Sequence, residues 1–428
     1  MIEIAAFVLV TTGFSLFIQD KFKIPLPITL LLIAIFLKSI HINAFNINNA
    51  LFDEIIIVLL PILISVDVLN LKMEDIKKNA ISLFYIAAIS VLLSIGAGLV
   101  VNKILFPSIE ISNTSLTLLL CMIMATDPIA TSAIFNNFKV PHKLKVLAEG
   151  ESLFNDATAL IIFTIMLNFL NGQSMDLIDV SRISFIVVFG AVLIGILMGT
   201  LGLFLLSFSK NPLVETVLLL SISFISFIIA EHFHVSGILS IIVSILMSNH
   251  IITKRIEQNN YTIVDVKTNF PQKVINKLSS AVETKLNHNL IKANIQFIAL
   301  IGTVILFLSI GNLINIQAII KYWKEIIIVF LICSLIRALM MAKFALISGQ
   351  TRKMQSIPVH WYLVLSSAGV KGGLSILMLH MLPKNFEYKE LFDAIVIGNI
   401  LIGTIIYPFL MTCLFKFYKE KFENDCSV

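Results

Sequence analysis

Two short polar motifs carry acidic side chains inside long apolar stretches of the sequence. They read ATDP at residues 125–128 and GESLFND at residues 150–156. A carboxylate in the middle of a lipid bilayer is costly, so acids at that depth usually bind an ion or carry a proton. The motifs therefore predict a binding site for a small cation or a proton, with Asp127 and Asp156 as its acids.

The first motif also predicts a break in its helix. Pro128 has no backbone N–H for the carbonyl of Met124, and a proline pushes the residue before it, Asp127, away from helical geometry. The break leaves carbonyls and the Thr126 hydroxyl free to coordinate an ion. A proline kink with a capping aspartate is the simpler alternative, but a helix cap belongs at the water interface.

The second motif offers several ligands on one helix. Ser152 and Asp156 are four residues apart and face the same way, as do Glu151 and Asn155. At 1.5 Å per residue, Asp156 lies about 15 Å and Asp127 about 12 Å from the same membrane surface, so the two acids share a depth. A polar seam between helices is the alternative, but such seams use Ser, Thr and Asn and rarely several carboxylates.

A third polar stretch interrupts an apolar segment nearer the C-terminus. It reads SSAGVKGG at residues 366–373, and its glycines weaken the helix around Lys371. Two interrupted helices in matching places are typical of a midplane transport site. Asp127 would offset the positive ends of the facing half-helices and Lys371 the negative ends. A glycine packing motif with a snorkelling lysine is the alternative.

The remaining deep charge, Arg337, needs an acidic partner, and Glu151 lies at a similar depth, so we predict that these two residues form a pair. Asp127, Asp156 and Glu151 supply three negative charges. Lys371 and Arg337 supply two positive charges, so one negative charge remains. That charge suits one monovalent cation or one proton, but not both together.

Composition places these motifs in a membrane. The chain has 428 residues, of which 58% are hydrophobic and 13% charged, and a soluble fold of this length cannot bury so much apolar surface. The net charge of +5 is not gathered in a basic arm, so we expect no nucleic-acid partner. The four cysteines lack the spacing of a metal site or a disulfide framework, and no cofactor is expected.

About 20 helical residues are needed to cross the hydrocarbon, and thirteen apolar segments approach that length. The first is predicted to be a retained span, because it lacks a basic leader and a cleavage site. We therefore predict an all-α membrane protein of about thirteen transmembrane helices. The segments lie at roughly 2–19, 24–41, 51–69, 80–104, 113–135, 146–170, 183–208, 212–233, 236–252, 291–314, 318–347, 360–382 and 392–417.

Lys and Arg concentrate in the loops after odd-numbered segments, among them Lys72, Lys77, Lys139 and Lys143. Positively charged loops stay in the cytoplasm, so the N-terminus is predicted outside and the C-terminus inside. The block of segments 1–6 then starts on the outside, and the block of segments 8–13 starts on the inside. Two inverted repeats with crossed, interrupted helices require this opposite orientation. The predicted parts are a first repeat at 1–170, a linker span at 171–211, a second repeat at 212–418 with a polar, partly helical loop at 253–290, and a short cytoplasmic tail at 419–428.

ATDPIA at residues 125–130 and GESLFNDA at residues 150–157 together resemble the NhaP-type monovalent cation/proton antiporters, relatives of animal sodium/proton exchangers. Weaker similarity covers AEHFHVSGILS at 230–240, the deep Arg337, and GVKGGLSI at 369–376, where the family usually has Arg at the position of Lys371. The resemblance implies a thirteen-helix fold, a homodimer, and a core domain that moves against a dimerisation domain.

The resemblance also implies roles for the motif residues. Asp156 would bind the cation and the proton, and the Asn-Asp pair that it forms with Asn155 goes with electroneutral exchange in the family. The remaining implied roles are ligands or lining at the crossing for Thr126, Asp127 and Ser152, and a structural charge pair for Glu151 and Arg337.

One segment departs from the family pattern. Relatives often read PPLLFEAGLNL in the third span, whereas residues 61–71 read PILISVDVLNL. Aligned through the shared LNL, Val66 takes the glutamate position and Asp67 follows it, about 100° away around the helix. The role of Asp67 as a ligand or gate is left open.

The preferred hypothesis is a secondary antiporter that exchanges Na⁺, with Li⁺ or K⁺ as alternatives, for H⁺ by alternating access. It would be a homodimer in a prokaryotic inner membrane and serve pH homeostasis, without enzyme activity. A cation channel or another secondary transporter is one alternative, but the sequence offers no ring of filter residues. A membrane-embedded aspartyl-type enzyme is another, but Asn155, Lys371 and the helix breaks would have no role in it.

Overall fold

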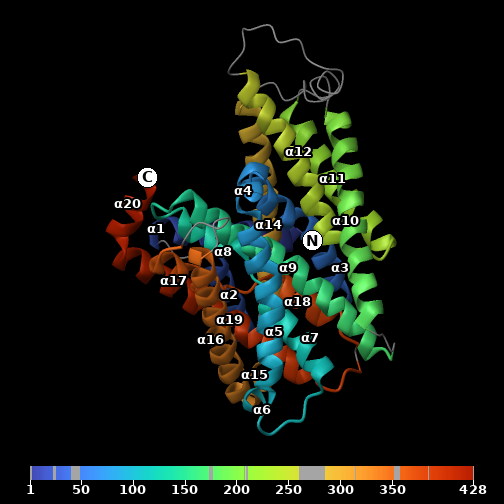
Figure 1. Cartoon of the computed structure of the whole chain (residues 1–428), viewed down its shortest axis with the longest axis vertical. Helices are drawn as coiled ribbons and strands as arrows, with labels where there is room; N and C mark the ends of the chain where they lie inside the picture. The colour runs from blue at the N-terminus through green and yellow to red at the C-terminus, as the bar shows by residue number, and fades with distance from the viewer. Residues whose placement is uncertain are drawn as a thin grey trace. The chain divides into compact units, whose positions relative to one another are not determined.

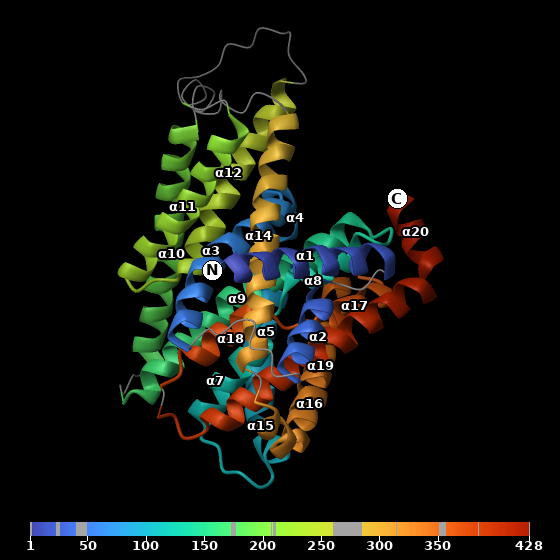
Figure 2. The same cartoon turned by 180° about the vertical axis from the view of Figure 1, so that it is seen from behind.

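The computed structural model describes residues 2–22, 26–39, 49–172, 177–206, 208, 211–259, 285–313, 315–350, 357–383 and 385–427. Within these ranges all regular structure is helical, as Figures 1 and 2 show from opposite sides. In chain order the elements are α1 (Ile2–Phe22), α2 (Leu26–Ser39), α3 (Asn49–Asn70), α4 (Met73–Phe84), the π-helix η1 (Tyr85–Ile89), α5 (Ser90–Val100), α6 (Asn102–Leu105), α7 (Asn113–Met124), α8 (Pro128–Phe135), α9 (His142–Leu170), α10 (Leu177–Leu206), α11 (Pro212–His232), α12 (Gly237–Asn259), α14 (Lys285–Leu313), α15 (Ile316–Lys321), α16 (Trp323–Gln350), α17 (Val359–Ser367), α18 (Gly373–His380), α19 (Lys389–Phe417) and α20 (Lys419–Ser427).

The all-α membrane prediction is confirmed. Each of the thirteen apolar segments corresponds to one helix or to consecutive helices. By length and composition, seven helical stretches among the described residues can cross a membrane, and further apolar helices are shorter. The seven are Met73–Val100, His142–Leu170, Ile178–Leu206, Pro212–His232, His288–Ser309, Trp323–Gly349 and Lys389–Phe417.

The chain divides into two compact units, and the boundary falls within α3, α4 and α14. Unit 1 comprises Met1–Ile57, Asn79–Met175 and Thr303–Val428, and unit 2 comprises Val58–Lys78 and Asp176–Gly302. Both polar motifs, Arg337 and the Lys371 stretch belong to unit 1. The five charges that the sequence analysis assigned to the crossing, Asp127, Glu151, Asp156, Arg337 and Lys371, are therefore held by one compact body.

Unit 1 contains two interrupted helices, as the sequence predicted. Helix α7 ends at Met124 and α8 begins at Pro128, where the proline removes the backbone donor. Helix α17 ends at Ser367 and α18 begins at Gly373, so residues 368–372 are unwound. Helix α9 runs without a break past both interruptions and carries the second motif.

Unit 2 is held together by small residues where its helices meet. A Cβ atom added at Gly195 of α10 would lie 2.8 Å from the backbone oxygen of Ser240 in α12, so these helices approach backbone to backbone. Hydroxyl groups add hydrogen bonds between elements, because Ser226 and Ser240 lie 2.6 Å apart and Ser65 and Ser223 lie 2.7 Å apart. Small and hydroxyl residues serve the same purpose in other membrane helix bundles.

The short C-terminal tail forms a helix that packs against unit 1. Phe422 of α20 is buried at 2% exposure and contacts the rings of Phe415 and His360. Asp425 accepts a hydrogen bond from Trp361 Nε1 at 2.7 Å, and the same carboxylate oxygen lies 2.7 Å from His360 Nε2. The helix that we predicted within the polar loop at 253–290 falls largely on residues 260–284, outside the described residues.

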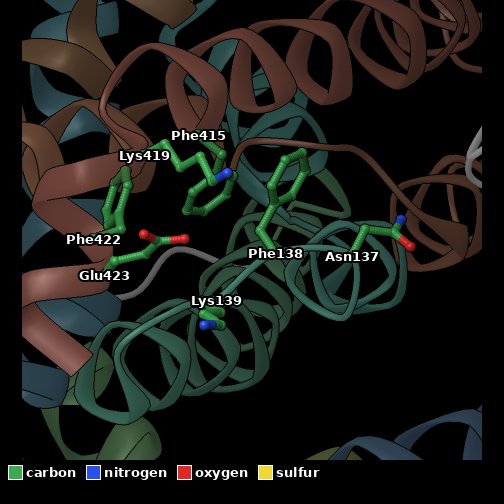
Figure 3. Close-up of a pocket in the computed structure, with 7 residues that line it drawn as sticks. All are labelled: Asn137, Phe138, Lys139, Phe415, Lys419, Phe422 and Glu423. Atoms are coloured by element: carbon green, nitrogen blue, oxygen red, sulfur yellow. The ribbon is translucent and has the colours of Figure 1, made fainter. Parts of the chain in front are cut away.

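A cavity of about 190 Å³ lies beside this C-terminal helix, as Figure 3 shows. It contains none of the acidic residues of the two motifs, so it is separate from the candidate ion site described below. Its lining residues are Asn137, Phe138, Lys139, Phe415, Lys419, Phe422 and Glu423.

Candidate ion-binding site

The two helix breaks of unit 1 cross and are joined through their backbones. The Asp127 amide donates a hydrogen bond of 2.7 Å to the carbonyl of Val370, which connects the gap after α7 to the gap after α17. Asp127 and Lys371 are both buried, at 8% and 6% exposure. The two breaks therefore bring an acid and a lysine to the crossing, where each can compensate the partial charges of the nearby helix ends.

Asp156 of α9 is attached to the first break. Its Oδ1 atom accepts a hydrogen bond of 2.9 Å from the backbone amide of Thr126. The Thr126 and Ser152 hydroxyl oxygens lie 2.9 Å apart, so a second polar contact joins the same two elements. Because this carboxylate uses a backbone donor, its position is set by the unwound chain as well as by its own helix.

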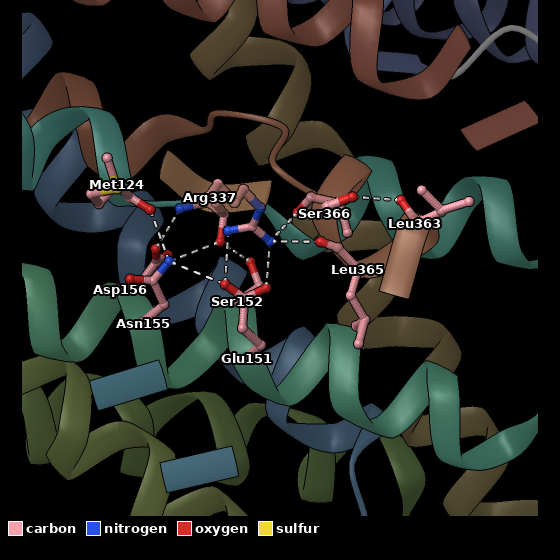
Figure 4. Close-up of polar contacts among 11 residues, drawn as sticks. Met124, Glu151, Ser152, Asn155, Asp156, Arg337, Leu363, Leu365 and Ser366 are labelled. Carbon is pink, nitrogen blue, oxygen red and sulfur yellow. Dashed lines mark hydrogen bonds and ion pairs between the residues drawn. The ribbon is translucent and has the colours of Figure 1, made fainter. Parts of the chain in front are cut away.

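Asn155, the residue before Asp156 on α9, also contacts the first break. Its Nδ2 donates to the Met124 carbonyl at 2.8 Å, satisfying an acceptor at the end of α7 that has lost its helical partner (Figure 4). Its Oδ1 is buried and makes no hydrogen bond to the described residues. An unpaired buried oxygen is costly, and a bound cation would supply its missing partner.

Glu151 and Arg337 form a two-pronged ion pair. Arg337 Nη1 and Nη2 lie 3.0 and 2.8 Å from the two carboxylate oxygens of Glu151, and both residues are buried (Figure 4). Nη2 also donates to the carbonyls of Leu365 and Ala368, at 3.2 and 3.1 Å, where α17 ends. The guanidinium therefore joins α9 and α16 to the second break.

The site can offer oxygen ligands of the kind that hard cations prefer. Those within the crossing are the Asp156 carboxylate, the Asn155 amide oxygen and the hydroxyls of Thr126 and Ser152. Lys371 is close enough for its charge to act on Asp156 and on Glu151. Asp67 belongs to the other unit, where it is half-buried near the end of α3.

Sequence reasoning missed two features of the second break. Gly372 has no side chain where Asp127 approaches, since a Cβ atom added there would lie 2.6 Å from Asp127 Cβ. Tyr407 of α19 packs with Phe330 and Val370 beside the break, and its hydroxyl lies 2.8 Å from that of Ser334. The glycine pair was the available signal for the first feature, but a local pattern does not reveal which residue approaches it.

Gly372→Ala should impair transport and lower stability, because the added methyl group must displace Asp127. We expect a loss of about 1–3 kcal/mol, the usual cost of overpacking. Thermal unfolding in detergent and flux in liposomes would measure both effects. The matched control is Gly96→Ala in α5, where nothing lies within 4 Å and alanine favours the helix. Equal stability and equal flux in the two variants would contradict the close contact between Gly372 and Asp127.

Crossed half-helices with buried, partly compensated acids define an integral membrane ion transporter. Comparison with known proteins supports this class. The family model described as sodium/hydrogen exchanger, transmembrane, matches residues 5–416. The chain therefore belongs to the sodium/hydrogen exchanger family, which confirms the resemblance found in its motifs.

Several relatives cover most of the chain. The Na⁺/H⁺ antiporter ApNhaP of Aphanothece halophytica is 27% identical over 395 residues, which are 91% of this chain and 68% of that protein. The Na⁺/H⁺ antiporter NhaG of Bacillus atrophaeus is 24% identical, covering 95% of this chain and 74% of that protein. Sodium/hydrogen exchanger 2 of Oryctolagus cuniculus is 35% identical over 147 residues, which span 33% of this chain and only 18% of the exchanger.

The fold is shared with a solved structure. The sodium proton antiporter MjNhaP1 from Methanocaldococcus jannaschii, at pH 8, superposes with a TM-score of 0.71 and covers 95% of this chain and 98% of its own. The two sequences are 14% identical, so this likeness concerns the fold.

Proposed function

We propose that this chain is a secondary antiporter that exchanges Na⁺ for H⁺ at Asp156 and so serves pH homeostasis. The proposal rests on the environment of Asp156. Its carboxylate is held at the crossing by the Thr126 amide, and the side-chain oxygen of the neighbouring Asn155 is buried without a hydrogen bond to the described residues. Membership of the sodium/hydrogen exchanger family supports the choice of substrates.

Competition for one carboxylate accounts for the coupling. Glu151 is neutralised by Arg337, and Asp127 shares the crossing with Lys371, which leaves the charge of Asp156 for the substrate. Na⁺ and H⁺ therefore replace each other at Asp156, and alternating access turns this replacement into exchange. One charge then moves in each direction, so the exchange is electroneutral.

The arrangement in the membrane belongs to the same proposal. The distribution of Lys and Arg supports an N-terminus outside and a C-terminus in the cytoplasm of a prokaryotic cell. The two interrupted helices support a first inverted repeat at residues 1–170 and a second at 212–418. We also propose a homodimer, in which each copy carries a complete crossing.

Reconstitution in liposomes containing a pH-sensitive dye tests the function. We expect Na⁺ added outside to drive proton efflux from acid-loaded vesicles, and parallel additions of Li⁺ and K⁺ to give the order of preference. Clamping the membrane potential with K⁺ and valinomycin should leave the rate unchanged if exchange is electroneutral. Cation flux without proton movement would instead support a channel.

A further inference from the structure

Glu149 is a buried carboxylate that the proposed exchange site does not use. It lies on α9 with 5% exposure, and its Oε1 accepts a hydrogen bond of 2.7 Å from the Ser132 hydroxyl of α8. The Lys145 ammonium, four residues earlier, is 3.7 Å from the same oxygen. A buried acid with only partial compensation is expensive to maintain in a membrane protein, which points to a function.

The position of Glu149 on its helix relates it to Asp156. Glu149, Ser152 and Asp156 are separated by three and then four residues, so all three project from one face of α9. Two turns separate the carboxylates, a rise of about 10 Å. The Ser152 hydroxyl lies between them and is paired with that of Thr126.

The same line of polar groups continues to the surface. Lys145 has a side chain that is 36% exposed, and its ammonium lies 3.4 Å from the amide oxygen of the exposed Asn136. From this end inward, α8 and α9 thus present an exposed amide and ammonium, then Glu149 with Ser132, then the hydroxyl pair, and finally Asp156. Polar side chains therefore mark the approach to Asp156 from the end where α9 begins.

We propose that Glu149 attracts and briefly binds ions on their way to and from Asp156, on the side of the membrane where α9 begins. Its negative charge raises the local concentration of Na⁺ and H⁺, and it binds them in passage between the aqueous surface and Asp156. Lys145 reduces this attraction and so limits the affinity. The inference rests on the proposed exchange function, and in the proposed orientation this side is the cytoplasm.

A purely structural role makes a different prediction. Glu149 could simply brace α8 against α9 through Ser132, and that brace needs an acceptor oxygen but no charge. Glu149→Gln retains an oxygen for the Ser132 hydroxyl and removes the charge. Ser132→Ala does the reverse, because it removes the hydrogen bond and retains the carboxylate. A comparison of the two variants therefore shows whether the charge of Glu149 or its hydrogen bond to Ser132 affects exchange.

The experiment compares exchange in everted and right-side-out membrane vesicles. For Glu149→Gln we expect the Na⁺ concentration for half-maximal exchange to rise roughly fivefold on the side where α9 begins, as loss of the attraction between an entering ion and a unit charge about 4 Å away in water implies. The Na⁺ concentration for half-maximal exchange on the opposite side should not change. Lys145→Gln should shift the same side in the opposite direction, and Ser132→Ala should shift neither side.

Each outcome decides between the explanations. Unchanged half-saturation on both sides for Glu149→Gln would overturn the proposal, as would equal shifts on both sides. Equal loss of thermal stability in Glu149→Gln and Ser132→Ala, without any sided shift, would establish the brace alone. Absence of exchange in the unmodified chain would instead refute the exchange function itself, which this comparison detects separately.

Discussion

Asp156→Asn should abolish coupled exchange while leaving the protein folded. Asparagine keeps an oxygen to accept the Thr126 amide, so the contact that positions this side chain survives. The charge that both substrates need is lost. Opposite unit charges 4 Å apart attract by about 4 kcal/mol at an effective dielectric of 20. Each 1.4 kcal/mol is a factor of ten, so we expect a loss on the order of 100-fold or more in Na⁺-driven proton flux.

A binding measurement and a control variant accompany this prediction. Na⁺ should raise the thermal unfolding midpoint of the unmodified chain, because a ligand that binds only the folded state stabilises it, and it should not raise that of the variant. Asp393→Asn in α19 is the matched control, since it makes the same chemical change at a half-exposed aspartate paired with Lys389. Exchange at the normal rate in Asp156→Asn would remove this residue from the centre of the mechanism.

The fold could be predicted from the sequence because its signals are local. Apolar segments of membrane length appear as helices, and Pro128 marks where α8 begins. The helix boundaries were less accurate. The segment predicted at 80–104 begins earlier as α4, whose first turns are polar, and it contains the π-helical turn η1. Neither feature follows from mean hydropathy, since a polar first turn lowers it and a π-turn leaves it unchanged.

The candidate site was predictable only in part. Contacts between residues close in the sequence could be predicted, and most contacts between distant segments could not. The side chains grouped on α9 lie near one another because residues four apart share a helix face. Contacts between distant segments had no such signal. The hydrogen bond from Asp127 to the Val370 carbonyl and the approach of Asp127 to Gly372 depend on how two breaks cross in space.

The charge pair illustrates what geometry adds to a prediction from depth. Depth alone suggested that Arg337 and Glu151 could be partners, and the structure places them in a two-pronged contact. It also gives Arg337 two carbonyl acceptors, those of Leu365 and Ala368, that no sequence pattern indicated. The arginine consequently has more partners to lose than the glutamate, which leads to an unequal effect of mutation.

Arg337→Ala should destabilise the protein strongly, and more than Glu151→Gln. Removing the guanidinium leaves a buried carboxylate without its cation, at a cost of about 3–5 kcal/mol, and it leaves the carbonyls at the end of α17 without their donor. In Glu151→Gln the guanidinium keeps those carbonyls and an amide oxygen. Thermal unfolding in detergent should therefore rank the unmodified chain first, Glu151→Gln second and Arg337→Ala last.

Two further variants test whether charge alone explains this ranking. Arg337→Lys restores the positive charge but not the planar fork, so it cannot bond both carboxylate oxygens and the two carbonyls together, and we expect it to fall between the other variants. The double variant Glu151→Gln/Arg337→Ala should be more stable than Arg337→Ala alone, because no buried charge is left unpaired. If the double variant instead shows the sum of the two single losses, the residues act independently, and Arg337 stabilises the crossing through the carbonyls of α17.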